Sequence, residues 1–310
     1  MSPVSEAVLE PAAGSRAAAP AALKPTRPLY WSVRRELWEN RSIYLAPLGV
    51  AAFGVVGLVI HGITMPSHLP GMLAQSPAPP GSTSAAYRMG MLLMLATGFI
   101  TGAFYCLEAL NSERRDRSVM FWKSLPVSDL TTVLAKASVP LALLPLLTFA
   151  SLVAMQLTML LLSSAVLLAQ GHGVAALWRE VQPLRMWPAL LYGLAAMVLW
   201  HAPVYGFLLL ASGWARRTAA LWAVLPLLAL GVLEKLTMDT THFAAAVQYR
   251  LIGWYGEAFL APARERIPFN PLTSPTPGRF LGTPGLWIGL AVAALCLAAA
   301  VRLRRYREPI

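Results

Sequence analysis

The residues of this chain that are best suited to recognition lie together in one polar segment, residues 108–136. A short apolar group follows a dense run of mixed charge. The group ends in Phe121 and Trp122, and Lys123 comes directly after it. That run consists of Glu113, Arg114, Arg115, Asp116 and Arg117. Because aromatic and arginine side chains supply most of the binding energy at protein interfaces, the segment is suited to docking into a groove on a partner. The same aromatic pair could instead pack on a membrane surface, and the residues alone leave both interpretations open.

Motifs for covalent or nucleotide chemistry are missing from the sequence. None of its four lysines follows a glycine, so there is no phosphate-binding GxxxxGK[ST] loop through which the chain could hydrolyse ATP. The sequence contains neither an HExxH metal motif nor a GxSxG nucleophile motif. Cys106 and Cys296 lie inside apolar runs, where cysteine behaves as a small hydrophobic residue. We therefore expect no metal, no cofactor bound by the chain itself and no enzymatic activity.

The composition predicts the elements that position the polar segment. The chain is 57% hydrophobic and only 13% charged, and its mean hydropathy is +0.58, whereas soluble domains carry about 25% charged residues. Apolar runs long enough to cross a bilayer as helices recur along the chain. The sequence therefore predicts an all-α polytopic membrane protein with six spans. These spans are predicted at about 43–63, 89–107, 138–169, 188–211, 214–233 and 285–301.

The distribution of lysine and arginine orients the predicted spans. Seventeen of the 25 basic residues lie on the side that holds both termini and the polar loop 108–137. Because basic residues collect in cytoplasmic loops, both termini and this loop are predicted to be cytoplasmic. The net charge of +11 is thus explained by topology, and nucleic acid is not a predicted partner. The longest outer segment, 235–283, can form short helices in its first half but not in its proline-rich second half.

The N-terminal region divides into a tail and a helix. Residues 1–27 are rich in Ala, Pro and Ser, a composition typical of a disordered tail, which we expect to be cytoplasmic. Residues 28–44 predict an interfacial helix, because one side of it carries large aromatic and apolar side chains that favour the membrane surface. Those side chains are Tyr30, Trp31, Leu37 and Trp38. The alternative is a plain extension of the first span.

The sequence also contains a candidate helix cap and a few polar residues within the predicted spans. Ser128 or Asp129 can cap the helix that leads into the third span, because each offers a side-chain acceptor. Three polar side chains within the predicted spans, Gln156, His201 and Tyr205, are candidates for contact with a substrate. A buried hydrogen bond between helices would explain Gln156 and His201 equally well.

The polar segment also resembles a known family. The stretch from Glu113 to Ser118, continued by Phe121 to Asp129 and by Lys136, is similar to a cytoplasmic loop in the membrane (permease) subunit of type-2 ATP-binding-cassette exporters, in one bacterial subgroup. The order of an interfacial helix, six spans and a large segment before the last span resembles the same family. The resemblance covers the chain from about Tyr30 to Arg305.

The resemblance implies a function and a set of partners. The loop 108–137 would contain the coupling helix that docks on a separate ATPase subunit, and residues 28–44 would form the connecting helix. Two such ATPase copies would bind ATP and Mg²⁺, and a second permease copy or paralogue would complete the path through the lipids of a bacterial inner membrane. The residues implied at the ATPase interface are Glu113, Arg114, Arg115, Asp116, Arg117, Phe121, Trp122 and Lys123.

Two other functions remain open. A secondary carrier would use His201 and Gln156 as its polar groups, although such carriers usually place ionisable residues at the membrane midplane. A membrane-embedded lipid-modifying enzyme would need paired acids or a histidine at one interface. The outer candidates are Glu257 with Glu265 and His242 with Asp239, and neither pair matches a motif.

Overall fold

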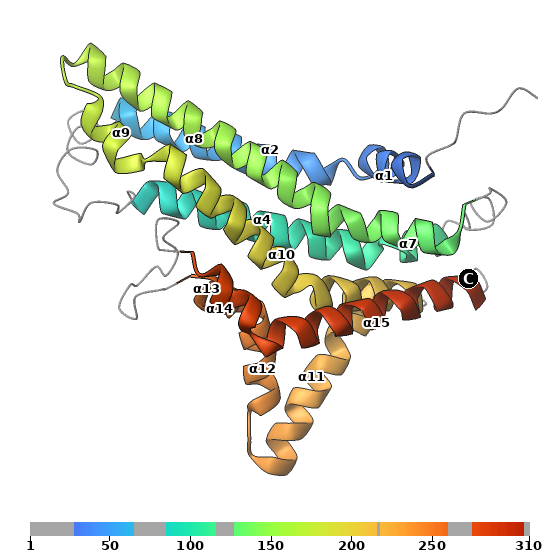
Figure 1. Cartoon of the computed structure of the whole chain (residues 1–310). Coiled ribbons are helices and arrows are strands. Elements are labelled where there is room, and N and C mark those ends of the chain that lie inside the picture. Colours follow the sequence, from blue (N-terminus) through green and yellow to red (C-terminus); the bar gives the residue numbers. More distant parts are fainter. Residues whose placement is uncertain (1–27, 65–84, 116–126, 216–217, 260–274, 307–310) are drawn as a thin grey trace, which may run out of the picture.

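The computed structural model describes most of the chain as a bundle of helices (Figure 1). The described residues are 28–64, 85–115, 127–215, 218–259 and 275–306. Within them the regular structure is helical, apart from one isolated β-bridge between Phe259 and Pro275. The all-α prediction is therefore confirmed. The helices are α1 (Pro28–Glu39), α2 (Ser42–Thr64), α4 (Ala85–Ala109), α5 (Asn111–Arg115), α7 (Asp129–Ser138), the π-helical turn η1 (Val139–Leu143), α8 (Leu144–Ala169), α9 (Ala175–Val181), α10 (Pro183–Trp214), α11 (Ala219–Met238), α12 (His242–Ile252), α13 (Trp254–Ala258), α14 (Pro277–Gly282) and α15 (Pro284–Tyr306).

Five helical stretches among the described residues are long and apolar enough to cross a membrane, as a polytopic membrane protein requires. They are Met89–Arg115, Asp129–Ala169, Ala175–Trp214, Ala219–Met238 and Pro284–Tyr306. The first predicted span, which lies in α2, contributes a shorter apolar helix over Ser42–Gly57. The count of six spans and their orientation therefore stay predictions.

The third predicted span is part of a longer helix. α7, η1 and α8 form one continuous helical stretch from Asp129 to Ala169. Ser128 begins it, because its side chain accepts a hydrogen bond from the backbone N–H of Thr131, which confirms the predicted cap. Pro140 lies in the π-helical turn, where the altered hydrogen bonding accommodates a residue without an N–H.

The fifth span is displaced along the chain from its predicted position. Trp214 ends α10 instead of joining the next helix, and α11 runs past Lys235 to Met238. The helix continues through its charged residues because the Glu234 carboxylate accepts hydrogen bonds from backbone groups that open α12. In the segment that follows, α14 begins at Pro277, so the expectation that this half forms no helix was wrong. Proline is tolerated there because the first turn of a helix needs no donor from it.

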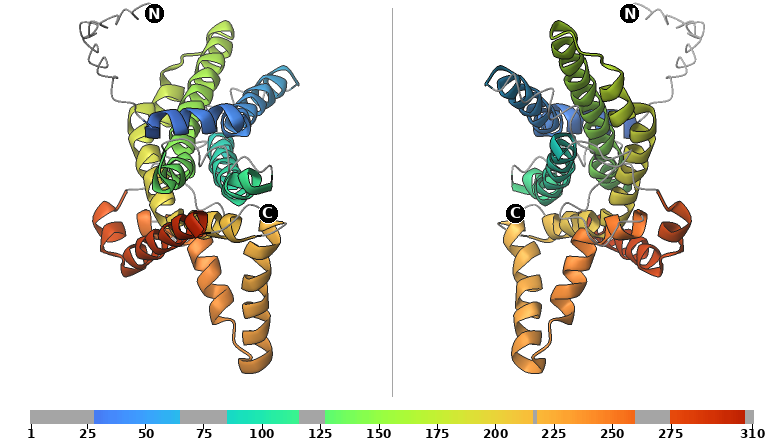
Figure 2. Two further views of the ribbon diagram at one scale, coloured as in Figure 1. Left: turned by 90° about the vertical axis from the view of Figure 1, so that its right-hand side faces the viewer. Right: turned by 90° about the vertical axis from the view of Figure 1, so that its left-hand side faces the viewer.

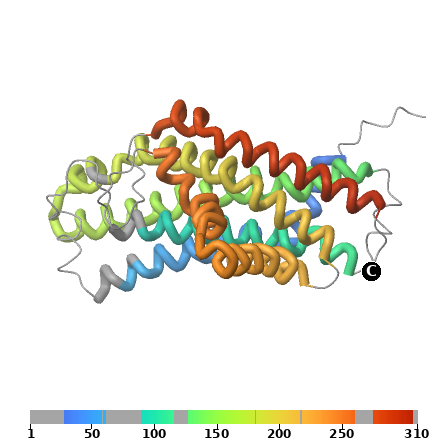
Figure 3. The backbone as a smooth tube through the Cα atoms, turned by 90° about the horizontal axis from the view of Figure 1, so that it is seen from below, coloured from blue at the N-terminus to red at the C-terminus, as the bar shows by residue number. Residues whose placement is uncertain are grey.

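α10 is the central helix of the bundle and packs against α4, α8, α11 and α15. α2 packs on α4 and α8, and α1 packs on α7 (Figure 1). α10 and α15 lie side by side along much of their length (Figure 3). Gly206 permits this approach, because a Cβ there would lie 3.2 Å from the carbonyl oxygen of Ala293 on α15. Small residues serve the same purpose wherever membrane helices pack closely.

α11 and α12 form a hairpin that stands away from the other helices (Figure 2). α11 buries only Ala219 and Ala223, and α12 has no fully buried residue. The far end of α12 is nevertheless attached to the bundle. Arg250 donates to the carbonyl oxygen of Gly285 at 3.1 Å, and its guanidinium lies 4.9 Å from the centre of the Trp200 ring.

Candidate functional site

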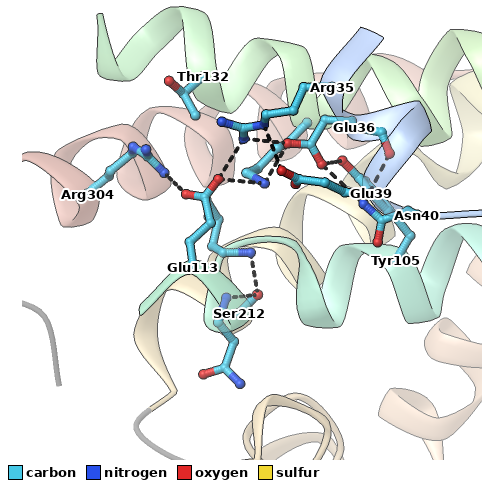
Figure 4. A network of polar contacts seen from close by, with 12 residues as sticks. Arg35, Glu36, Glu39, Asn40, Tyr105, Glu113, Thr132, Ser212 and Arg304 are labelled. Atoms are coloured by element: carbon cyan, nitrogen blue, oxygen red, sulfur yellow. Dashed lines mark hydrogen bonds and ion pairs between the residues drawn. The ribbon is translucent and has the colours of Figure 1, made fainter. Parts of the chain in front are cut away.

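A buried cluster of charged side chains joins both ends of the polar segment to the first and last helices (Figure 4). Its centre is formed by Glu36 on α1, Glu113 on α5 and Lys136 on α7, which are 1%, 6% and 2% exposed. We call this group, with Arg35, Arg304, Asp129 and Tyr105, the ionic cluster. Buried charges are rare unless they are paired, so the arrangement constrains all the helices that contribute to it.

Glu36 accepts hydrogen bonds from side chains on three helices. The Lys136 ammonium donates to Oε1 at 2.8 Å, and Arg35 donates to the same oxygen at 2.9 Å. The Tyr105 hydroxyl on α4 donates to Oε2 at 2.8 Å. Burial alone would raise the pKa of the Glu36 carboxyl, but the Lys136 and Arg35 charges and the Tyr105 hydroxyl together lower it below its usual range. Glu36 is therefore ionised at neutral pH.

Glu113 shares two cationic partners with Glu36 and binds a third, Arg304. Its Oε1 lies 2.8 Å from Arg35 and 3.1 Å from the Lys136 ammonium, and its Oε2 accepts from Arg304 at 2.6 Å. Arg304 also donates through Nε to Asp129 at 3.1 Å. Because Arg304 lies on α15 and Asp129 opens α7, the two ends of the polar segment are tied to each other and to the last helix.

The start of the polar segment is also fixed to the end of α10. The Ser212 hydroxyl accepts hydrogen bonds from the backbone N–H groups of Leu110 and Asn111, at 3.1 and 3.0 Å, where α4 turns into α5. Arg114 donates to the carbonyl oxygen of Gly213 at 2.7 Å. This carbonyl belongs to the last turn of α10, whose acceptors have no partner within the helix. A movement of the segment must therefore also move, or break from, α10.

The structure divides the predicted interface residues into three groups. Glu113 and Arg114 lie inside the bundle in the contacts above, whereas Arg115 is exposed at the end of α5. The remaining predicted residues lie outside the described part of the chain. They are Asp116, Arg117, Phe121, Trp122 and Lys123. The predicted tail, residues 1–27, also lies outside it.

α1 has the two faces that an interfacial helix requires. Tyr30, Trp31 and Trp38 are exposed, and the Arg34 guanidinium lies 5.3 and 4.8 Å from the centres of the two tryptophan rings. Leu37 instead packs against the core. The opposite, charged face is turned towards α7, because Glu36 projects into the ionic cluster. The exposed aromatic and cationic side chains suit the headgroup region of a membrane.

The three candidate substrate residues have partners within the protein. The Gln156 side-chain oxygen accepts from the Trp187 indole at 3.2 Å. The ring nitrogens of His201 lie 2.7 and 3.0 Å from the carbonyl oxygens of Met197 and Leu251. His201 and Tyr205 both contact the Phe99 ring, with ring centres 4.7 and 5.9 Å apart, whereas Gln156 lies elsewhere. Their role in substrate contact stays a prediction.

Sequence reasoning missed Glu36, Tyr105 and Arg304 as members of the ionic cluster, and it assigned Glu113 to a docking interface instead of to buried ion pairs. Glu36 looked like a solvated residue on the polar face of α1, and Arg304 looked like an ordinary charge at a span end. Lys136 was noted only as part of the family resemblance. One signal was present for Lys136, since no charged residue follows it until Arg179. Within the described residues, no group of three or more His, Cys, Asp or Glu side chains could hold a metal ion.

Compared with known proteins, the chain matches no family model, no curated protein and no solved structure.

Proposed function

We propose that this chain is the permease subunit of an ATP-binding-cassette transporter, and that its polar segment couples to separate ATPase subunits. The observation that carries the proposal is the ionic cluster, because it binds both ends of that segment to α1 and α15. Removing one partner of a buried ion pair is strongly destabilising, so these pairs resist separation of the segment from α1 and α15. A pull on the segment would therefore reach both helices, which supports a coupling role.

The cluster gives the proposed coupling a physical route. ATP binding would bring two ATPase subunits together, and their closure would displace the segment that they hold. Glu113 and Lys136 would carry that displacement to α4 and α8, and Arg304 would carry it to α15. The equilibrium between two arrangements of the spans would shift by the difference in the affinity of the ATPase for each of them.

The remaining parts of the proposal follow from the resemblance and the charge distribution. The protein would have six spans with both termini in the cytoplasm of a bacterium, and it would pair with a second copy or a paralogue in the inner membrane. ATP and Mg²⁺ would bind to the ATPase subunits, where the hydrolysis would take place. Spans with few polar groups suit an apolar or amphipathic cargo. The resemblance implies that this cargo would be moved out of the cell.

The proposal is tested by reconstitution with the ATPase. The candidate partner would be a soluble protein with a GxxxxGK[ST] motif, sought first among the products of the neighbouring genes. We expect vanadate-sensitive ATP hydrolysis by that protein to rise when the purified chain is added in lipid vesicles. An unrelated six-span protein in the same vesicles is the control. The proposal would be contradicted if the candidate ATPase did not bind the chain and if its rate of ATP hydrolysis were the same with and without the chain.

A further inference from the structure

Arg250, near the end of α12, places a guanidinium where three helices meet. The central carbon of that guanidinium lies 4.9 Å from the centre of the Trp200 ring on α10. The same group donates to the carbonyl oxygen of Gly285 on α15 at 3.1 Å. Gly289 on α15 makes room for it, because a Cβ at that position would overlap the guanidinium. The Arg250 side chain is partly buried, so protein replaces part of the water that would otherwise solvate its charge.

The described part of the chain provides no counter-ion for this guanidinium. Glu257, on the next helix, is bound to other groups, because it accepts from the Tyr249 hydroxyl at 2.9 Å and lies 3.6 Å from Arg279. Burial lowers the pKa of the Arg250 guanidinium, and no carboxylate among the described residues offsets that effect. Arg35 in the ionic cluster is desolvated too, but its carboxylate partners outweigh burial and raise its pKa. The positive charge of Arg250 is therefore left for another group to neutralise.

Arg250 also has more donors than the described residues around it can satisfy. A guanidinium carries about five N–H donors, and the hydrogen bond to Gly285 is the one that the described residues accept. Beside it, the indole N–H of Trp200 is buried and likewise has no acceptor within the described helices. Water could satisfy these donors but would leave the charge uncompensated. A ligand that brings both negative charge and acceptor oxygens would satisfy the whole site.

A phosphate group has both of these properties. An arginine can bind two phosphate oxygens at once through parallel N–H donors, and such charged hydrogen bonds are stronger than neutral ones. Its donors are fixed in one plane, which makes arginine better suited than lysine to this geometry. The Trp200 ring and Gly289 already restrict the guanidinium, so less conformational entropy would be lost when a ligand binds. The arrangement thus suits a phosphate, carried by a phospholipid headgroup or free in solution.

We propose that Arg250 binds a phosphate group at the junction of α10, α12 and α15. The phosphate would neutralise the guanidinium and accept from N–H groups that the described residues leave without partners. It would also fasten the far end of α12 to the bundle, because the bound anion removes the cost of the partly buried charge there. This proposal stands independently of the ATPase, because none of its residues belongs to the polar segment or to the ionic cluster.

The test measures ligand binding by the purified full-length chain in a neutral detergent. The probes are phosphatidylglycerol, a diacylglycerol with the same acyl chains, inorganic phosphate and chloride. Arg250→Met should lower the affinity for the phosphate-bearing probes at least about tenfold, the effect of losing one hydrogen bond to a charged group. Arg179→Met is the matched control, because Arg179 also donates to a backbone carbonyl, at 3.4 Å, but lies exposed on α9. Its affinity should equal that of the wild type.

Melting temperatures separate ligand binding from a purely structural role of Arg250. A bound phosphate should raise the melting temperature of the wild type and of Arg179→Met but not that of Arg250→Met. Loss of a structural contact alone would lower the melting temperature of Arg250→Met equally with and without the probe. Stabilisation by phosphatidylglycerol alone would identify a lipid headgroup as the source of the phosphate, and stabilisation by inorganic phosphate would identify a free anion.

Two results would overturn the proposal. In the first, the wild type binds phosphatidylglycerol no better than the diacylglycerol and inorganic phosphate no better than chloride. In the second, Arg250→Met binds the phosphate-bearing probes as tightly as the wild type does. The first result is obtained on the unmodified protein, so it decides the question even if Arg250→Met fails to fold.

Discussion

Replacing Lys136 with methionine is expected to lower the free energy of unfolding by about 3–5 kcal/mol, the usual effect of removing one partner from a buried ion pair. The Lys136 side chain is 2% exposed and binds Glu36 and Glu113. Methionine has a similar length but no charge, so both carboxylates would lose a cation while they stay buried. Reversible denaturation of the purified protein in mixed micelles measures the effect.

Two variants make this expectation specific. Lys235→Met removes the same charge from an exposed pair with Asp239, and exposed pairs are worth about 0–1 kcal/mol. Adding Glu36→Gln to Lys136→Met should recover part of the loss, since it removes one uncompensated buried charge. If Lys136→Met costs no more than Lys235→Met, the ionic cluster does not hold these helices together.

Replacing Trp122 with alanine is expected to weaken binding of the ATPase at least about 30-fold, the effect of losing an interface residue worth about 2 kcal/mol. Under the proposed function this aromatic side chain anchors the segment in the groove of its partner. Co-purification and the ATPase rate of the reconstituted complex measure the effect. Thermal stability should be unchanged, because the prediction concerns binding and not folding.

Trp178→Ala is the matched control for this loss. Trp178 is 40% exposed, and its indole donates to Ser164 at 3.1 Å. It lies on α9, at the far end of α8 from the ionic cluster (Figure 1). It should bind the ATPase as the wild type does. Glu113→Ala is a poor test of docking, because Glu113 is buried in the ionic cluster and its loss would destabilise the bundle. Full binding by Trp122→Ala would argue against docking through this segment.

The sequence predicted the helices well because long uncharged runs have few alternatives in a membrane protein. It was less accurate about where they end. α11 passes through Glu234 and Lys235 because Glu234 caps the next helix, a contact that arises only once the hairpin has formed. The Ser128 cap was predictable, since capping depends on residues three positions apart.

The ionic cluster could not be predicted from local patterns. Glu113 binds Arg35 and Arg304, which are 78 and 191 residues away in the chain. Nothing in the spacing of these residues distinguishes a buried pair from two solvated charges at span ends. The polar segment itself was conspicuous in the sequence, but the side chains that secure its ends come from helices at both ends of the chain.

The proposed coupling requires the polar segment to face the cytoplasm, and cysteine labelling at residue 122 measures this directly. Trp122→Cys would be made in a chain whose native Cys106 and Cys296 are replaced, and treated with a maleimide that cannot cross membranes. We predict labelling in inverted membrane vesicles and none in right-side-out vesicles. Labelling in right-side-out vesicles alone would place the segment outside the cell, where no ATPase could reach it.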